Sequence, residues 1–106
     1  MKSNLTLIGM PGAGKSTVGI ILAKKLGMDF VDTDVLIQVR HGRTLQQIMD
    51  EGGYQHLRAM EEQEILRLAM ENHVIATGGS VVYSARAMAH LQEISRVIFL
   101  EVGFAE

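Results

Sequence analysis

The first chemical signal in the sequence is a glycine-rich segment near the N-terminus. Residues 9–16 have the sequence GMPGAGKS, which matches the pattern G-x-x-x-x-G-K-[ST], and Thr17 follows. Glycines let main-chain N–H groups turn inward around a phosphate. Lys15 places a positive charge beside the β- and γ-phosphates, and Ser16 offers a hydroxyl to Mg²⁺. The pattern therefore predicts a site for ATP and Mg²⁺. The predicted nucleotide-binding residues are Gly12, Ala13, Gly14, Lys15, Ser16 and Thr17.

The alternative is a glycine-rich turn that matches this pattern by chance. The segment before Gly9 is the apolar run LTLI, which is typical of a short strand. After the segment, apolar residues recur at helical spacing, namely Val18, Ile21, Leu22 and Leu26. A strand before the loop and a helix after it are the context that a P-loop requires, because the positive end of the helix points at the phosphate. We therefore favour the P-loop interpretation.

Two aspartates, Asp32 and Asp34, follow a second short apolar run at residues 30–31. Ligands gather at the carboxyl ends of parallel strands, so both aspartates are expected beside the P-loop. Asp32 is predicted to hold the Mg²⁺ shell. Asp34 is predicted to bind an acceptor hydroxyl and to help remove its proton, which makes it, with Lys15, a predicted catalytic residue. The alternative is that one aspartate caps the next helix, and both roles can hold together.

Two further segments are candidates for the acceptor site. Residues 78–80, GGS, follow a third apolar run, where glycines permit close approach of a ligand to main-chain N–H groups. A tight turn explains them equally well. Arg58 precedes Glu61 and Glu62 at helical spacing, and an arginine held by a carboxylate can still bind a substrate carboxylate. A solvated surface ion pair is the alternative. The predicted acceptor-binding residues are Asp34, Arg58, Gly78 and Gly79.

Composition limits the partners of the chain. It has 106 residues, a net charge of −2 and no cysteine. This charge gives no sign of the clustered Lys and Arg that bind nucleic acids or anionic membranes. Without cysteine there are no disulfides, which suits a reducing cytoplasm. No apolar run approaches the roughly 20 residues of a membrane span. We therefore expect a cytoplasmic protein with a small-molecule substrate, and no nucleic-acid or membrane partner.

The elements that must position these residues alternate between strand and helix. Apolar runs predict strands at residues 5–8, 30–31, 74–76 and 97–100. Periodicity and capping residues predict helices over residues 15–26, 36–39, 45–49 (capped by Thr44) and 54–72, and after a Ser84 cap. Continuous apolar strands that alternate with helices predict an α/β fold, with a parallel sheet flanked by helices on both faces.

Taken together, these segments resemble the shikimate kinase family of P-loop small-molecule kinases. The matching stretches are GMPGAGKSTVG at 9–19, FVDTD at 30–34, HGRTLQQI at 41–48, LRAMEEQE at 57–64 and VIATGG at 74–79. The resemblance implies transfer of the γ-phosphoryl group of ATP to the 3-hydroxyl of shikimate, in the pathway towards aromatic amino acids. It implies that Lys15 and Ser16 serve ATP and Mg²⁺, and that Asp32 supports the metal through water.

The resemblance also implies roles on the acceptor side. Asp34 would bind the ring hydroxyls of shikimate, Arg58 would pair with its carboxylate, and Gly79 would donate its main-chain N–H. The family usually carries a third glycine where this chain has Ser80. This departure leaves open a related enzyme for another hydroxy acid, such as homoserine. A nucleotide-binding module without catalysis is a second alternative, against which the intact Lys15, Ser16 and aspartates argue.

Finally, the resemblance bears on the extent of the domain. In the family the chain continues with a mobile lid that bears an arginine, a second substrate arginine, a fifth strand and a closing helix. We therefore expect residues 1–106 to be a single P-loop kinase domain without these parts, with phosphate affinity and little turnover of its own. Such a sheet should expose an apolar edge. The full-length protein is expected to be a monomer.

Overall fold

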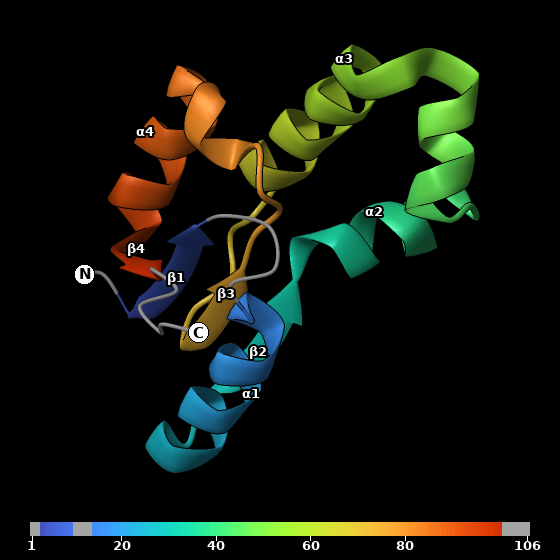
Figure 1. Cartoon of the computed structure of the whole chain (residues 1–106). Helices are drawn as coiled ribbons and strands as arrows, with labels where there is room; N and C mark the ends of the chain where they lie inside the picture. The colour runs from blue at the N-terminus through green and yellow to red at the C-terminus, as the bar shows by residue number, and fades with distance from the viewer. Residues whose placement is uncertain (1–2, 10–13, 101–106) are drawn as a thin grey trace, which may run out of the picture.

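The computed structural model describes residues 3–9 and 14–100. In these residues the chain forms a sheet of four parallel strands in the order β2-β3-β1-β4. The strands are β1 (Asn4–Gly9), β2 (Asp29–Asp32), β3 (His73–Ala76) and β4 (Ser95–Leu100). Helices lie on both sides of the sheet (Figure 1). The four predicted strands and the predicted α/β class are confirmed.

Each face of the sheet carries its own apolar cluster, because successive residues of a strand point to opposite faces. Leu7 of β1 joins Ala23 and Val74 in a cluster beneath α1 (Lys15–Leu26). Ile8, the next residue of β1, joins the cluster on the opposite face. That face is covered by α3 (Leu45–Leu66), η1 (Val81–Tyr83) and α4 (Ala85–Ile94). Strands buried on both faces explain the continuous apolar runs in the sequence.

Helix α2 (Thr33–His41) begins directly after β2, earlier than the predicted start at Leu36. The cause is an N-cap that the aspartate motif supplies. Asp32 Oδ1 accepts hydrogen bonds from the main-chain N–H groups of Asp34, at 2.9 Å, and Val35, at 3.4 Å. Asp34 therefore lies in the first turn of a helix rather than in a loop.

Helix α3 joins two helices that the sequence predicted separately. Thr44 caps its start as predicted, in a capping box: Thr44 Oγ1 accepts the Gln47 N–H at 3.1 Å, and Gln47 Oε1 accepts the Thr44 N–H at 2.8 Å. The chain bends at Gly53, whose φ of 78° and ψ of −173° are open to glycine alone among common residues. Figure 1 shows the two halves of α3 meeting at a sharp angle.

The second half of α3 ends at Leu66, so the predicted extension to Asn72 is wrong. The N–H groups of Arg67 and Leu68 bond back to carbonyl groups three residues earlier, at 3.2 and 3.0 Å, which tightens and ends the helix. Leu68 nevertheless stays buried in the core. Its apolar character therefore continued the helical pattern past the point where the backbone leaves the helix. The Ser84 cap of α4, by contrast, is confirmed.

Strand β4 forms one edge of the sheet, and part of it is apolar and exposed. Ile98 and Phe99 have exposed fractions of 40% and 56%. The predicted apolar edge is therefore confirmed. Within residues 3–9 and 14–100, none of the helices combines the length and the apolar character that a membrane crossing would need.

Candidate functional site

The end of β1 and the start of α1 lie on the phosphate side of the site. Gly12 and Ala13, both predicted to bind the nucleotide, lie outside the described residues. Gly14 precedes α1 and has no side chain with which to cap it. The main-chain N–H groups of the first turn, where Ser16 and Thr17 lie, are therefore left for an anion.

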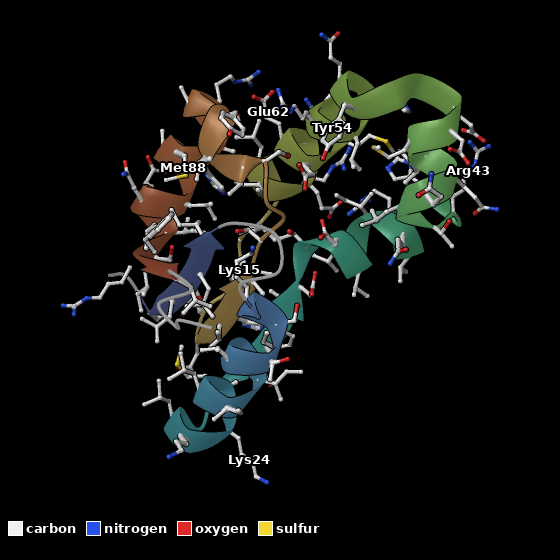
Figure 2. The ribbon with its side chains drawn as sticks, viewed as in Figure 1. Lys15, Lys24, Arg43, Tyr54, Glu62 and Met88 are labelled. Atoms are coloured by element: carbon white, nitrogen blue, oxygen red, sulfur yellow. The ribbon has the colours of Figure 1, made fainter. Side chains whose placement is uncertain are left out.

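Lys15 is buried at the start of α1, near the centre of the molecule (Figure 2). Its Nζ donates a hydrogen bond to the carbonyl oxygen of Gly9 at 3.0 Å. Burial lowers the pKa of Lys15, whereas the negative charges of Asp34, Asp32 and Glu61 act to raise it. A positive charge in a desolvated place attracts a phosphate more strongly than the same charge in water.

Asp32, at the carboxyl end of β2, makes two kinds of contact. Its Oδ1 atom accepts the N–H groups that cap α2. Its Oδ2 atom accepts a hydrogen bond from the Ser16 hydroxyl at 2.5 Å. The capping role that the sequence left open therefore belongs to Asp32, which contacts the P-loop serine as well. A hydroxyl and a carboxylate oxygen lie side by side at this point, and hard cations such as Mg²⁺ prefer oxygen ligands.

Asp34 contributes its carboxyl group to the site from the first turn of α2. Its Oδ1 atom is buried and has no hydrogen-bond partner among the described residues. Burial raises the pKa of Asp34 and the charge of Asp32 raises it further, while Glu61 and Lys15 lower it. An oxygen in this position can accept a hydrogen bond from a ligand hydroxyl. The raised pKa also makes the carboxylate a stronger base than an exposed one.

Two cavities meet at Asp34 and Gly79. The first, of about 230 Å³, is lined by residues 14–17, the two aspartates and residues 77–79. The second, of about 490 Å³, lies between α3 and the segment after β3. Its wall includes Leu45, Tyr54, Leu57, Arg58, Glu61, Ser80, Val82 and Tyr83. Because Asp34 and Gly79 line both cavities, a group bound in one can reach a group bound in the other.

Gly78 packs closely against two carboxyl groups of the site. A Cβ atom there would overlap with the Glu61 carboxylate and would lie 2.9 Å from Asp34 Oδ1. Glu61 also accepts a hydrogen bond from the Ser80 hydroxyl. Burial raises the pKa of Glu61, and this hydrogen bond opposes the rise. Glu61 is not among the site residues predicted from the sequence. The sequence does contain one sign of its role, because Glu61 lies on the apolar side of a predicted helix, where an acidic residue is unusual.

Arg58 is not held in the way that the sequence predicted. Among the described residues, no ion pair within 4.0 Å joins Arg58 to Glu61 or Glu62. Its guanidinium carbon instead lies 5.6 Å from the ring centroid of Tyr54 and 4.9 Å from that of Tyr83. These are cation–π distances. Neither tyrosine is among the site residues predicted from the sequence. Tyr83 comes from a distant segment and meets Arg58 only in the folded chain.

The parallel sheet, the buried lysine at the start of α1, and the aspartates at the end of β2 define a P-loop nucleotide-binding fold. A sequence profile described as shikimate kinase matches residues 11–106. This match covers most of the chain. The chain belongs to the shikimate kinase family.

Individual relatives show the extent of the similarity. Shikimate kinase from Thermobifida fusca is 44% identical over 102 residues, which cover 94% of this chain and 58% of that protein. Shikimate kinase from Mycobacterium tuberculosis is 41% identical over 108 residues, which cover 100% of this chain and 60% of that protein. The solved structure of shikimate kinase from Acinetobacter baumannii in complex with shikimate has a TM-score of 0.89 at 34% identity, covering 94% of this chain and 56% of that one. The chain therefore spans somewhat more than half the length of these relatives.

Proposed function

We propose that this chain carries the nucleotide site and the acceptor site of a kinase that transfers the γ-phosphoryl group of ATP to the 3-hydroxyl of shikimate. The position of Asp34 carries the proposal. Its Oδ1 atom is buried without a hydrogen-bond partner among the described residues. The residue Asp34 lines both cavities. A phosphate at the P-loop and a hydroxyl in the second cavity would meet at this carboxyl group. Family membership supports the same reaction.

On the nucleotide side, Lys15 and the N–H groups of the first turn of α1 would bind the phosphates. Ser16 and Asp32 fit Mg²⁺, because their oxygens are adjacent at 2.5 Å. Within the described part of the chain, no group of three or more His, Cys, Asp or Glu side chains could hold a metal ion. Phosphate oxygens and water would therefore complete the coordination, as is usual for Mg²⁺. Bound Mg²⁺ would neutralise charge on the β- and γ-phosphates.

On the acceptor side, Asp34 would accept a hydrogen bond from the attacking hydroxyl and take its proton as the new O–P bond forms. The proton would pass to the Asp34 carboxylate, and ADP would leave as the bond between the γ-phosphorus and the β,γ-bridging oxygen breaks. Arg58 would pair with the acceptor carboxylate. Gly78 and Gly79 would bind an acceptor oxygen through their main-chain N–H groups. The acceptor is thereby fixed at the junction of the two cavities, which is the positioning that phosphoryl transfer requires.

Replacing Asp34 with Asn tests this proposal. Asn removes the negative charge that the acceptor hydroxyl needs as its partner, so we expect shikimate to bind about tenfold or more weakly by calorimetry. In the full-length protein, turnover should fall by about 10²-fold or more. Affinity for Mg-ATP should stay within about twofold, because Lys15 and Ser16 are unchanged. The matched control is Asp29→Asn, an exposed aspartate at the start of β2, which should change neither ligand. Equal shikimate binding by the wild type and Asp34→Asn would contradict the proposal.

A second candidate acceptor, another hydroxy acid such as homoserine, is favoured by one observation. Ser80 lines the acceptor cavity, at a position where the family pattern has a glycine. Its hydroxyl donates a hydrogen bond to the Glu61 carboxylate. A panel of hydroxy acids, titrated under the same conditions as shikimate, separates the two candidates. A catalytically inactive nucleotide-binding module would bind Mg-ATP and none of the acceptors. A monomeric state of the full-length protein and a cytoplasmic location stay predictions.

A further inference from the structure

Arg58 lies within cation–π distance of two aromatic rings that come from different parts of the chain. Tyr54 precedes it by one turn in the second half of α3, where Figure 2 shows it. Tyr83 ends η1, beyond β3. The guanidinium carbon is 5.6 Å from the first ring centroid and 4.9 Å from the second. The two rings therefore contact Arg58 from α3 and from η1.

The carboxylates at helical spacing from Arg58 have other partners. Glu61 accepts the Ser80 hydroxyl. Glu62 accepts the Ser84 hydroxyl at 2.6 Å and pairs with Arg86 at 3.6 Å.

Aromatic rings and a carboxylate act differently on a guanidinium group. A carboxylate occupies the N–H donors along one edge of the guanidinium and offsets its charge. A ring contacts the flat face, leaves the edge donors available and keeps the charge. Arg58 and both tyrosines line the cavity of about 490 Å³ that also contains Asp34. An oriented cation with available donors in the wall of this cavity suits a ligand that carries a carboxylate.

We propose that Tyr54 and Tyr83 are positioning residues, which orient Arg58 for the carboxylate of the acceptor and so set a preference for acceptors that carry one. This inference rests on the proposed function, because it names how the acceptor site selects its substrate class. It assigns the tyrosines no contact with the reacting hydroxyl. Their effect is therefore expected in acceptor affinity and not in nucleotide affinity.

The test is a calorimetric titration of the 106-residue chain with shikimate, with the neutral primary amide of shikimate, and with Mg-ATP. The variants are Tyr54→Leu, Tyr83→Leu and the double variant. Tyr54→Phe and Tyr83→Phe are the matched controls, because they keep the ring and remove only the hydroxyl. Tyr54 and Tyr83 are 60% and 72% exposed, so the substitutions should leave the core intact, which thermal unfolding checks.

For each Leu variant we expect shikimate to bind about two- to fivefold more weakly, and for the double variant about tenfold. The Phe variants should bind shikimate like the wild type. Affinity for the neutral amide and for Mg-ATP should not change in any variant, since neither ligand places a carboxylate on Arg58. A merely structural role of the tyrosines would instead weaken all three ligands together.

Two outcomes would overturn the inference alone: wild-type affinity for shikimate in the double Leu variant, or an equal loss of the acid and its amide. A wild-type chain that binds Mg-ATP but neither shikimate nor another hydroxy acid would end the proposed function, and this inference with it. The two failures are distinguished by the wild-type titration.

Discussion

Asp34 and Glu61 are two carboxyl groups in one desolvated part of the molecule, and they differ in how far the sequence reveals them. Asp34 follows a strand in a recognisable motif, and the structure brings it together with Lys15, Ser16 and Gly79 around one cavity, as expected. Glu61 interrupts the apolar side of a helix, where a solvent-exposed partner for Arg58 was the simpler interpretation. Only the folded chain shows that Ser80 is its partner. Such pairing depends on packing between distant segments, which periodicity does not report.

The buried Glu61 carboxyl predicts a pH dependence of stability. Burial raises its pKa in the folded chain, with Asp34 adding to the rise and Ser80 and Arg58 opposing it. The folded state therefore holds this proton more firmly than the unfolded state. Stability should accordingly fall as pH rises from the ordinary glutamate range, about 4.3, through the raised folded pKa. In Glu61→Gln this loss is absent, while the amide oxygen can still accept the Ser80 hydroxyl.

Urea unfolding at a series of pH values measures this effect. Relative to the wild type, Glu61→Gln should gain unfolding free energy as pH rises through that window, and the difference should approach zero near pH 4. Glu93→Gln, at an exposed position of α4, is the matched control and should show no such trend. A pH-independent difference for Glu61→Gln would mean that its ionisation does not affect folding.

At the scale of elements, the sequence predicts most of what is local. Thr44 and Ser84 cap helices as expected, because capping depends on residues within one turn. The end of the second half of α3 was misplaced, since Leu68 and Met70 remain apolar for the core after the backbone has left the helix. The break that the sequence predicted between residues 49 and 54 is present as the kink at Gly53. The two helices on either side of Gly53 could be separate or could join at a kink. Which of these occurs depends on how they pack in the folded chain, and the local sequence does not determine that packing.

The kink at Gly53 predicts a cost for any side chain at this position. Its φ of 78° with ψ of −173° lies in a region that only glycine occupies readily, although a Cβ atom there would meet no atom within 4 Å. Gly53→Ala should therefore lower the free energy of unfolding by about 1–3 kcal/mol through backbone strain alone. Gln55→Ala, in the same helix and exposed, should lower it by less than about 0.5 kcal/mol. Urea unfolding measures the free energy of unfolding of both variants. If Gly53→Ala and Gln55→Ala are equally stable, a side chain at position 53 causes no backbone strain.

At the scale of the whole molecule, strand order brings the site together. Leu7 of β1 and Asp32 of β2 both pair with Ala76 of β3. Gly9, the aspartates and the glycines after β3 therefore lie at the same end of the sheet, where the strands have their carboxyl ends. The sequence indicated strands and their parallel direction but not that β3 lies between β1 and β2. Pairing of distant strands depends on how helices pack across the finished sheet, which no single segment encodes.

The same arrangement leaves β4 at the other side of the sheet, with consequences for association. Ile98 pairs in register with Leu7 and is 40% exposed on an edge strand, whose unpaired main-chain groups can bind a second strand. We expect the chain to self-associate through this edge in concentrated solution. Ile98→Lys removes an apolar contact worth roughly 1 kcal/mol and adds repulsion between copies, so it should raise the dissociation constant by about fivefold or more in sedimentation velocity. Val39→Lys makes the same change on α2, where the residue is 75% exposed, and should leave the dissociation constant unchanged. If Ile98→Lys and Val39→Lys change the dissociation constant equally, the contact lies elsewhere. If the wild-type chain stays monomeric at millimolar concentration, the apolar edge does not drive association.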